Sequence, residues 1–413
     1  MAEQFFVHEF DNGLTLLGQR MEQVSSAALT VALPGGASRD PEELAGAASV
    51  AAHWLLRGAG ERDTRQLNDA LDSLGCRHSE SAHAEHLVLS GGLLGRNLPA
   101  ALAIYADILR RPRLSDDTFP ACRDLVVQEL EGLADEPMRM CNLLIREKFY
   151  PHPLGRSPLG SRATLEAMTA DAVRRHLGRG LTPRGTLMAV AGKFEWAELV
   201  DVVAEHFADW TGPAVDELTP AEPADGVTHI TKSTAQVQIT LAYPAARIQQ
   251  EQYYAGRVAQ MVLSGGMSSR LFTEVREKRA LVYAVVAQYH NLKDHAGMFV
   301  YAGTTPERAQ ETLEVTVREL RGLAGGVGAD ELARAKAKLK SALIMQGEST
   351  AARADALVGD WYHLGRLRSL EELSAAVEAV TVDDVVAYAR AFPAEGFTVL
   401  TIGPEPLDTS MLN

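Results

Sequence analysis

A single histidine on a helix of small residues is the first place in this sequence that could carry chemistry. The segment AGAASVAAHWLLRGAG, from Ala45 to Gly60, is rich in alanine, which favours a helix, and it ends at glycines, which stop one. It contains His53, whose imidazole can ligate a metal ion or transfer a proton. The same histidine could equally be an ordinary residue of a packed helix. Other segments of the chain are needed to distinguish the two interpretations.

Further histidines follow in the strand-like stretch CRHSESAHAEHLVLSG. Successive side chains of a strand point to opposite faces, so His83 and His86 would diverge, whereas His78 and Glu80 would share a face. A rebuilt metal site that uses His53 and His78 is therefore one reading. Solvated histidines on an edge strand are the other.

An arginine and a tyrosine seven residues apart, Arg276 and Tyr283, occur in VREKRALVY. A guanidinium and a phenol both donate hydrogen bonds, and both suit a carbonyl oxygen that becomes an oxyanion. The bare spacing carries no information, because a surface arginine on a helix followed by a tyrosine in a strand gives the same pattern. Its meaning depends on the surrounding segment.

The composition is that of a globular protein with more than one core. The chain has 413 residues, of which 46% are hydrophobic and 23% charged, and that length favours two or more domains. The formal net charge of −14 argues against a nucleic-acid partner, since phosphate binding needs clustered Lys and Arg. No stretch approaches ~18 uninterrupted apolar residues, so we expect no membrane span.

The N-terminal residues and the cysteines suggest a cytoplasmic protein. MAEQFFVHEFDNG has no basic region followed by an apolar core, and it does not resemble a transit peptide. Cys76, Cys122 and Cys141 are odd in number and lack metal-type spacing. We expect reduced, buried thiols and a cytoplasmic location.

The chain repeats itself. Three pairs of similar segments recur in the same order at separations of 210, 212 and 211 residues, and they contain Pro34 and Pro244, Thr169 and Thr381, and Gly192 and Gly403. The repeat predicts two homologous domains, 1–210 and 229–413, joined by a linker over 211–228. The linker is rich in proline and acidic residues, and its prolines prevent a continuous helix.

Each repeat shows the same order of expected elements. Asp11-Asn12-Gly13 lies between apolar runs and predicts a hairpin; a further strand, a helix, more strand and long amphipathic helices follow. This order favours an α+β fold in which each domain is a mainly antiparallel sheet covered by helices. Two linked domains of this kind could close over a substrate, as one half of a clamshell.

Three longer segments carry a family resemblance. FDNGLTLL, YPHPLGRSPLGSRATLEAMT (150–169) and LSGGMSSRLFTEVREKRALVYAV (263–285) resemble the pitrilysin family of inverted-motif zinc peptidases, in its mitochondrial processing peptidase-like branch. The resemblance runs along nearly the whole chain. Members that cut peptides carry H-x-x-E-H on a helix of the first half, where two His ligate zinc and the Glu is the general base.

On that motif this chain has lost most of its catalytic residues. Ser49 stands at the first His, Ala52 at the base Glu, and only His53 remains; the later ligand Glu corresponds to Glu129 in LVVQELEGL. A catalytic zinc has three protein ligands, and the missing base is worth roughly 10²–10⁴-fold in rate. The resemblance therefore implies that this chain binds no metal of its own and does not hydrolyse peptides alone.

The same comparison implies that the second half is intact. In active relatives an Arg and a Tyr face the zinc across a closed chamber, and Arg276 and Tyr283 match them. This pattern resembles the non-metal subunit of two-chain family members. We expect a zinc-bearing homologous partner, which holds the zinc, and unfolded peptides bound partly by strand addition to a sheet edge. Some non-metal subunits have a long glycine-rich loop where only Gly265-Gly266 stand here, which argues against a presequence-receptor role.

Two other functions stay open. One is a catalytically inert homodimer that binds peptides or acts as a scaffold, as do family members built into respiratory complexes. The other is a residual metallopeptidase with a rebuilt site that involves His53, Glu129 or His78.

Overall fold

The computed structural model describes residues 3–221 and 226–412, so residues 222–225 of the predicted linker lie outside the described residues. The chain forms two compact units. Unit 1 holds the described residues up to Gly132, then Arg156–Pro220 and Gln346–Leu367. Unit 2 holds Leu133–Gly155 and the described residues of Ala221–Met345 and from Arg368 onwards.

Unit 1 contains a six-stranded sheet in the order β1-β2-β8-β3-β7-β6. Its strands are β1 (Gln4–Glu9), β2 (Thr15–Arg20), β3 (Ser26–Leu33), β6 (Arg77–Ala82), β7 (Leu87–Leu94) and β8 (Leu187–Gly192). Every neighbouring pair is antiparallel except β2 and β8. The hairpin predicted at Asp11-Asn12-Gly13 is confirmed, since Glu9 pairs with Thr15 and Gly13 takes the positive φ of 91° that the turn requires. A separate small ribbon joins β4 (Gly58–Ala59) and β5 (Arg62–Asp63).

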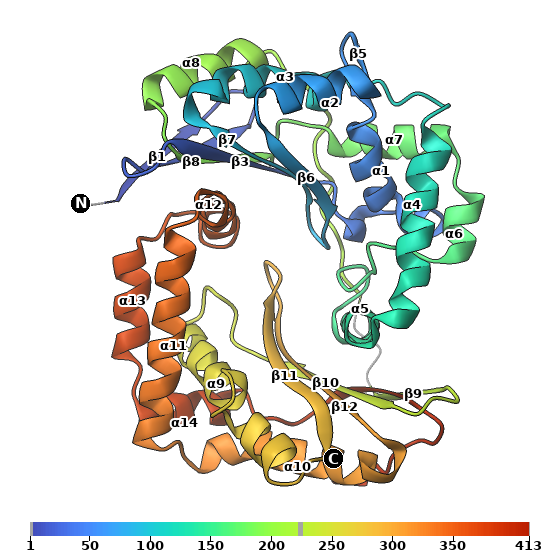
Figure 1. Ribbon diagram of the computed structural model, residues 1–413, viewed down its shortest axis with the longest axis vertical. Helices are drawn as coiled ribbons and strands as arrows, with labels where there is room; N and C mark the ends of the chain where they lie inside the picture. The colour runs from blue at the N-terminus through green and yellow to red at the C-terminus, as the bar shows by residue number, and fades with distance from the viewer. Residues whose placement is uncertain (1–2, 222–225, 413) are drawn as a thin grey trace. The chain divides into compact units, whose positions relative to one another are not determined.

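Helices cover both faces of this sheet (Figure 1). The helices of unit 1 are α1 (Ala47–Leu55), α2 (Thr64–Ser73), α3 (Leu98–Arg110), α4 (Phe119–Gly132), α6 (Arg162–Ala167), α7 (Ala170–Gly180), α8 (Trp196–Phe207) and α12 (Thr350–Leu364). Strand β2 shows the two covers. A Cβ at Gly18 would meet the Trp196 ring of α8, whereas Leu17 packs in one cluster with Ala354 and Leu357 of α12. The alternation of a strand thus places α8 on one face and α12 on the other.

Unit 2 repeats the strand order of unit 1. Its sheet runs β11-β12-β10-β13-β9, formed by β9 (Val227–Thr231), β10 (Val237–Pro244), β11 (Val282–Asn291), β12 (Ala296–Thr304) and β13 (Thr398–Gly403). Only the β13–β9 pair is parallel. Read from β9, this is the unit 1 order from β2, with the parallel pair in the same place. The shared order agrees with a duplicated α+β domain whose sheet is mainly antiparallel.

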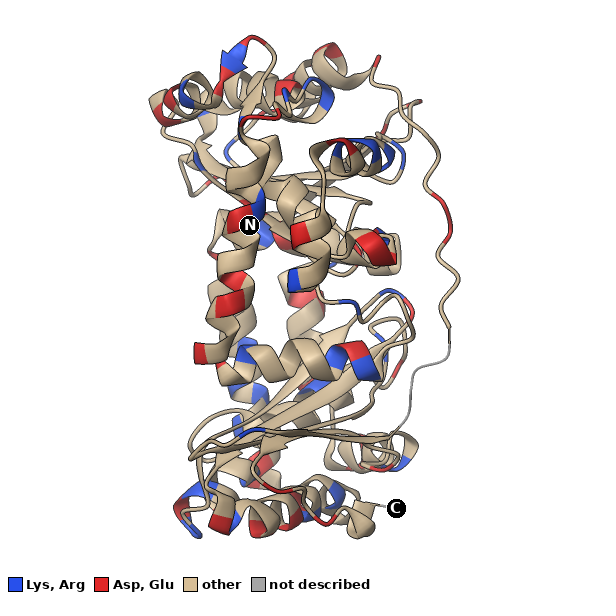
Figure 2. Cartoon of the chain, turned by 90° about the vertical axis from the view of Figure 1, so that its right-hand side faces the viewer, with Lys and Arg blue, Asp and Glu red and all other residues tan. Residues whose placement is uncertain are grey.

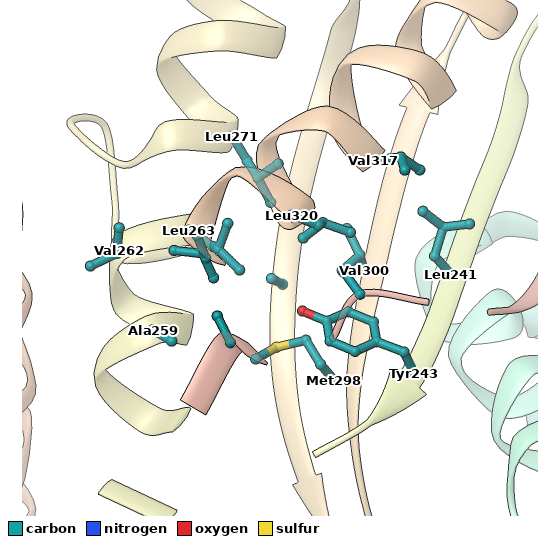
Figure 3. Close-up of a cluster of buried hydrophobic side chains, with 14 of the residues drawn as sticks. Leu241, Tyr243, Ala259, Val262, Leu263, Leu271, Met298, Val300, Val317 and Leu320 are labelled. Atoms are coloured by element: carbon teal, nitrogen blue, oxygen red, sulfur yellow. The ribbon is translucent and has the colours of Figure 1, made fainter. Parts of the chain in front are cut away.

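The unit 2 sheet also has helices on both faces. They are α5 (Pro137–Phe149), α9 (Tyr253–Ser264), α10 (Ala309–Gly322), α11 (Ala329–Gly347), α13 (Leu370–Ala379) and α14 (Val382–Ala391). Met298 and Val300 of β12 join the large buried cluster with residues of α9 and α10, shown in Figure 3. The intervening Phe299 and Tyr301 face α5, where they contact Phe149 and Cys141.

Two helices depart from the linear division predicted from the repeat. Helix α5 comes from the 1–210 segment but belongs to unit 2, and α12 comes from the 229–413 segment but belongs to unit 1. Specific polar contacts seat α12 on the unit 1 sheet: Arg353 Nε donates to Gln19 Oε1 at 2.6 Å, and Thr30 Oγ1 donates to Asp355 Oδ1 at 2.7 Å. A sheet that is apolar on both faces needs a second cover, and the helix that supplies it need not be near in sequence.

Charged residues, coloured in Figure 2, lie mostly on the helices, while the strands carry few. Across the described residues, no helix combines the length and the apolar character that crossing a membrane requires.

The seating of α12 predicts a large loss of stability when its core contact is removed. Leu357 is 1% exposed, so we expect Leu357→Ala to lower the free energy of unfolding by about 2–5 kcal/mol, from lost burial and a residual cavity. Leu125→Ala is the matched control, because Leu125 is 39% exposed on α4, and about 0.5 kcal/mol or less is expected there. Urea unfolding measures both. Equal effects would show that α12 does not contribute to the core of unit 1.

The cysteines give a second prediction. Cys76, Cys122 and Cys141 are free and buried, and burial raises the pKa of each thiol, that of Cys141 to about 11. The thiolate is the reactive form, so a raised pKa leaves little of it at pH 8. We expect none of the three to react quickly with a disulfide reagent at pH 8 in the folded protein, and all three to react once denaturant is added. A thiol that titrates quickly in the folded state would contradict this burial.

Candidate functional site

Helix α1 is positioned by a buried carboxylate. Asp40 Oδ2 accepts a hydrogen bond from Gly46 N at 3.1 Å, and Ala48 N lies 3.2 Å from either carboxylate oxygen. His176 Nε2 lies 2.9 Å from Oδ1, and the Asp40 side chain is fully buried. A carboxylate at a helix N-terminus pairs with N–H groups that have no partner within the helix. Sequence reasoning missed Asp40; an acidic residue shortly before a small-residue helix was the available signal.

The residues that the family resemblance aligns with the first His and the Glu of H-x-x-E-H, Ser49 and Ala52, serve packing. Ser49 is 7% exposed, and its hydroxyl donates to the Pro158 carbonyl oxygen at 2.7 Å. Ala52 is 1% exposed and presents only a methyl group. The first ligand position is therefore engaged in a structural hydrogen bond, and the base position has no group that can accept a proton.

His53 pairs with Glu80 rather than with His78. His53 Nδ1 lies 2.8 Å from Glu80 Oε1, across the packing of α1 against β6, and both side chains are partly exposed. Because an ionised carboxylate only accepts hydrogen bonds, Nδ1 of His53 donates in this contact, and in the corresponding neutral tautomer Nε2 carries the lone pair. His78 shares the strand face of Glu80, and its buried Nδ1 has no hydrogen-bond partner in the described part of the chain.

The remaining ligand candidate lies on α4, which packs against α1. The Trp54 ring meets the Phe119 ring at 4.9 Å, and Trp54 Nε1 donates to Thr118 Oγ1 at 3.0 Å. Glu129 is half-buried in the last part of α4. Within residues 3–221 and 226–412, no group of three or more His, Cys, Asp or Glu side chains is arranged to hold a metal ion. The described residues do not fit a catalytic zinc ion, which needs three protein ligands.

Arg276 lies in a short π-helix, Phe272–Glu277, on the surface of unit 2. Its guanidinium is exposed and stacks on the Phe272 ring, 5.1 Å from the ring centre. Ion pairs fix the turn beneath it: Lys278 Nζ and Arg279 Nη1 lie 2.6 Å and 2.8 Å from the Glu274 carboxylate. These hydrogen bonds hold the pKa of the Glu274 carboxyl below its usual value. The π-helical geometry is rare and frequently occurs at functional sites.

Tyr283 is pushed out of its strand by a β-bulge. Val282 pairs with Thr304 and Ala284 with Gly303, so Tyr283 is the extra residue between them, and it is 64% exposed. A bulge turns a side chain out of the regular alternation of the strand. The link from the π-helix runs through Ala280, which has a positive φ of 52° that non-glycine residues rarely adopt. The segment is thus shaped to present both side chains of the pair.

Tyr283 borders a cavity of about 720 Å³ in unit 2. The opposite wall is α5, which contributes Arg139, Asn142 and Arg146. Sequence reasoning placed α5 in the first domain and so did not connect it with Tyr283. The spacing of its apolar residues predicts an amphipathic helix but does not say which sheet that helix covers.

Comparisons with known proteins agree along the whole chain. A family model described as Insulinase (Peptidase family M16) matches residues 16–162, and one described as Peptidase M16 inactive domain matches residues 167–339. An uncharacterised zinc protease of Mycobacterium tuberculosis (strain H37Rv) is 28% identical over 403 residues, with 95% of this chain and 91% of that protein covered.

Solved structures share the fold. A peptidase M16 inactive domain from Pseudomonas fluorescens superposes with a TM-score of 0.89 at 20% identity, over 98% of this chain and 99% of that one. A protease from Helicobacter pylori gives a TM-score of 0.90 at 18% identity, over 98% and 100%.

The geometry around His53 predicts weak metal binding. We expect the purified chain to retain less than one equivalent of zinc after dialysis at neutral pH, because Ser49 and Ala52 supply no ligand. Metal analysis by mass spectrometry measures the content, and His53→Ala should leave it unchanged. Stoichiometric zinc that is lost in His53→Ala would instead establish a rebuilt site.

Proposed function

The chain belongs to the M16 family of pitrilysin-like peptidases, and from this premise we propose that it is the non-zinc subunit of a two-chain metallopeptidase. It pairs with a zinc-bearing homologue, offers Arg276 and Tyr283 to the reacting peptide, and contributes peptide-binding surface. Its substrates are unfolded peptides.

The observation that carries the proposal is a contrast between two sites. At the zinc-motif positions, Ser49 is committed to the Pro158 carbonyl and Ala52 is buried. At the other site, Arg276 and Tyr283 are exposed on a segment shaped by a π-helix and a bulge. Among the described residues neither side chain has a hydrogen-bond partner. Two exposed hydrogen-bond donors of this kind favour a role in binding the reacting peptide over a purely structural one.

The chemistry of this chain would then be confined to hydrogen-bond donation and positioning. The guanidinium of Arg276 and the hydroxyl of Tyr283 donate to the peptide carbonyl oxygen as it gains negative charge. The partner's zinc ion would supply the activated water. Strand β6 is one edge of the unit 1 sheet and β11 is one edge of the unit 2 sheet, and such edges can accept an extended peptide through backbone hydrogen bonds.

The relatives set the alternatives. The Mycobacterium tuberculosis relative is named an uncharacterised zinc protease. Its name does not supply the zinc ligands that are missing from the present chain. An inert homodimer that binds peptides or acts as a scaffold would have the same fold. A residual peptidase would need a ligand beyond those that the described residues group together.

The proposal predicts that activity requires both chains. We expect no turnover of an unfolded fluorogenic peptide by this chain alone, and turnover when it is mixed with an H-x-x-E-H homologue from the same organism. Arg276→Ala should lower kcat/KM of the mixed complex by roughly 10²–10³-fold, the usual effect of removing one oxyanion donor. Tyr283→Phe should lower it by roughly tenfold or more. The control is Arg390→Ala, at an exposed arginine on α14.

Each contrary result favours a different function. Turnover that is unchanged in Arg276→Ala would favour a scaffold. Failure to form a mixed complex in size-exclusion chromatography, together with a stable homodimer, would favour a homodimeric binding protein. Peptide cleavage by this chain alone would establish a residual peptidase.

A further inference from the structure

The cavity beside Tyr283 has two arginines in its lining. It lies in unit 2 between α5 and the strands β11 and β12, with a volume of about 720 Å³. The residues that matter here are Arg139, Asn142 and Arg146 on α5 and Tyr283 and Tyr301 on the strands. The chain as a whole has a formal net charge of −14, whereas this cavity contains two positively charged arginines.

The two arginines differ in their partners. Arg139 Nη1 lies 3.8 Å from the Glu136 carboxylate, which already balances its charge. Arg146 forms an ion pair with no carboxylate in the described part of the chain, and its buried Nε has no hydrogen-bond partner there. Its guanidinium stacks on the Phe299 ring, 5.7 Å from the ring centre. Arg146 is therefore held in place by packing while its donors stay without a counter-charge.

A half-buried guanidinium in this state is poised for an anion. Burial lowers the pKa of Arg146, because the charged form loses solvation and no carboxylate restores it. Arginine nevertheless stays protonated at neutral pH and keeps five N–H donors in a planar fork. That fork matches the two oxygens of a carboxylate, and the pair gains strength where water is partly excluded.

The neighbouring groups fit the same ligand. Asn142 precedes Arg146 by four residues, so the two side chains lie on one face of α5, and both line the cavity. Tyr283, whose hydroxyl the proposed function assigns to the peptide carbonyl, lies at the edge of the cavity. Tyr301 closes the floor and is already engaged, because its hydroxyl donates to Gln238 Oε1 at 2.5 Å.

We propose that this cavity binds a carboxylate of the peptide substrate, held by Arg146 with Asn142 as the flanking hydrogen-bond group. The inference rests on the proposed function, because it takes the peptide to be the ligand that reaches Tyr283. It adds a preference: peptides are selected by a C-terminal carboxylate or by an acidic side chain placed in this cavity. Both sources offer the same chemistry.

The experiment measures binding to the full-length chain alone by fluorescence anisotropy. Three labelled unfolded peptides share one sequence: one ends in a free carboxylate and has no acidic residue, one ends in an amide, and one ends in an amide but has an internal Glu. We expect one of the two carboxylate peptides to bind at least about tenfold more tightly than the plain amide, and the difference to shrink at high salt. Which peptide gains identifies the source of the carboxylate.

Variants assign the effect to Arg146. Arg146→Gln should abolish the difference between the peptides, and Arg146→Lys should keep part of it, since it preserves the charge but not the fork. The control is Arg318→Gln, at an exposed arginine on α10, which makes the same change of charge and should bind as the wild type does. Thermal unfolding of each variant checks that the fold is kept.

Two results would overturn the inference. One is equal affinity of the wild type for the three peptides, or no binding of any of them. The other is a preference for carboxylate that persists in a folded Arg146→Gln variant. Neither measurement involves the zinc-bearing homologue. The inference can therefore fail while the mixed complex still cleaves peptides, and the mixed complex can fail while this chain still selects carboxylates.

Discussion

Both sheets of this protein are apolar on both faces, and the fold depends on covering each face. In unit 1 the central strand β3 is buried along nearly its whole length, and in unit 2 strand β12 is buried throughout. A strand of this kind cannot leave one side to water, because each large apolar side chain that is exposed gives up about 1.5–3 kcal/mol of burial. One layer of helices is not enough, so α12 and α5 supply the second layer.

The exchange of these two helices also decides what the sites can contain. Helix α5 covers the unit 2 sheet through Cys141 and Phe149, and its other residues form the wall of the cavity beside Tyr283. A single helix thus combines a packing face with a face that carries Asn142 and Arg146. In unit 1, the N-terminal N–H groups of helix α1 need acceptors, and the buried Asp40 carboxylate accepts from two of them. Ser49 and Ala52 of this helix are buried in its packing.

Local sequence patterns were sufficient for some of these features. The hairpin at Asp11-Asn12-Gly13 follows from turn chemistry, and the α+β class follows from the order of apolar runs. The resemblance in 263–285 drew attention to Arg276 and Tyr283, although it did not predict the π-helix or the bulge. The bulge depends on how strands β11 and β12 pair, which the sequence of one strand does not specify.

Other features depend on contacts between distant residues. Sequence spacing does not predict the pairing of His53 with Glu80, because the pairing depends on how α1 packs against β6. The alternation of the strand places His78 and Glu80 on one face, so either could have been the partner of His53. The partners of α5 and α12 were missed for a related reason. Amphipathic periodicity shows that a helix has an apolar face, but the repeat suggested that each helix would stay with its own half.

The position of α12 in the chain also bears on synthesis by the ribosome. Unit 1 begins near the N-terminus, but its sheet lacks one cover until residues 346–367 have been made. During translation one apolar face of β2, β3 and β8 therefore stays uncovered until α12 has been made. Most of unit 2 is synthesised before that helix. Such a nascent chain exposes apolar sheet surface for most of its elongation, and surface of this kind favours aggregation before the fold is complete.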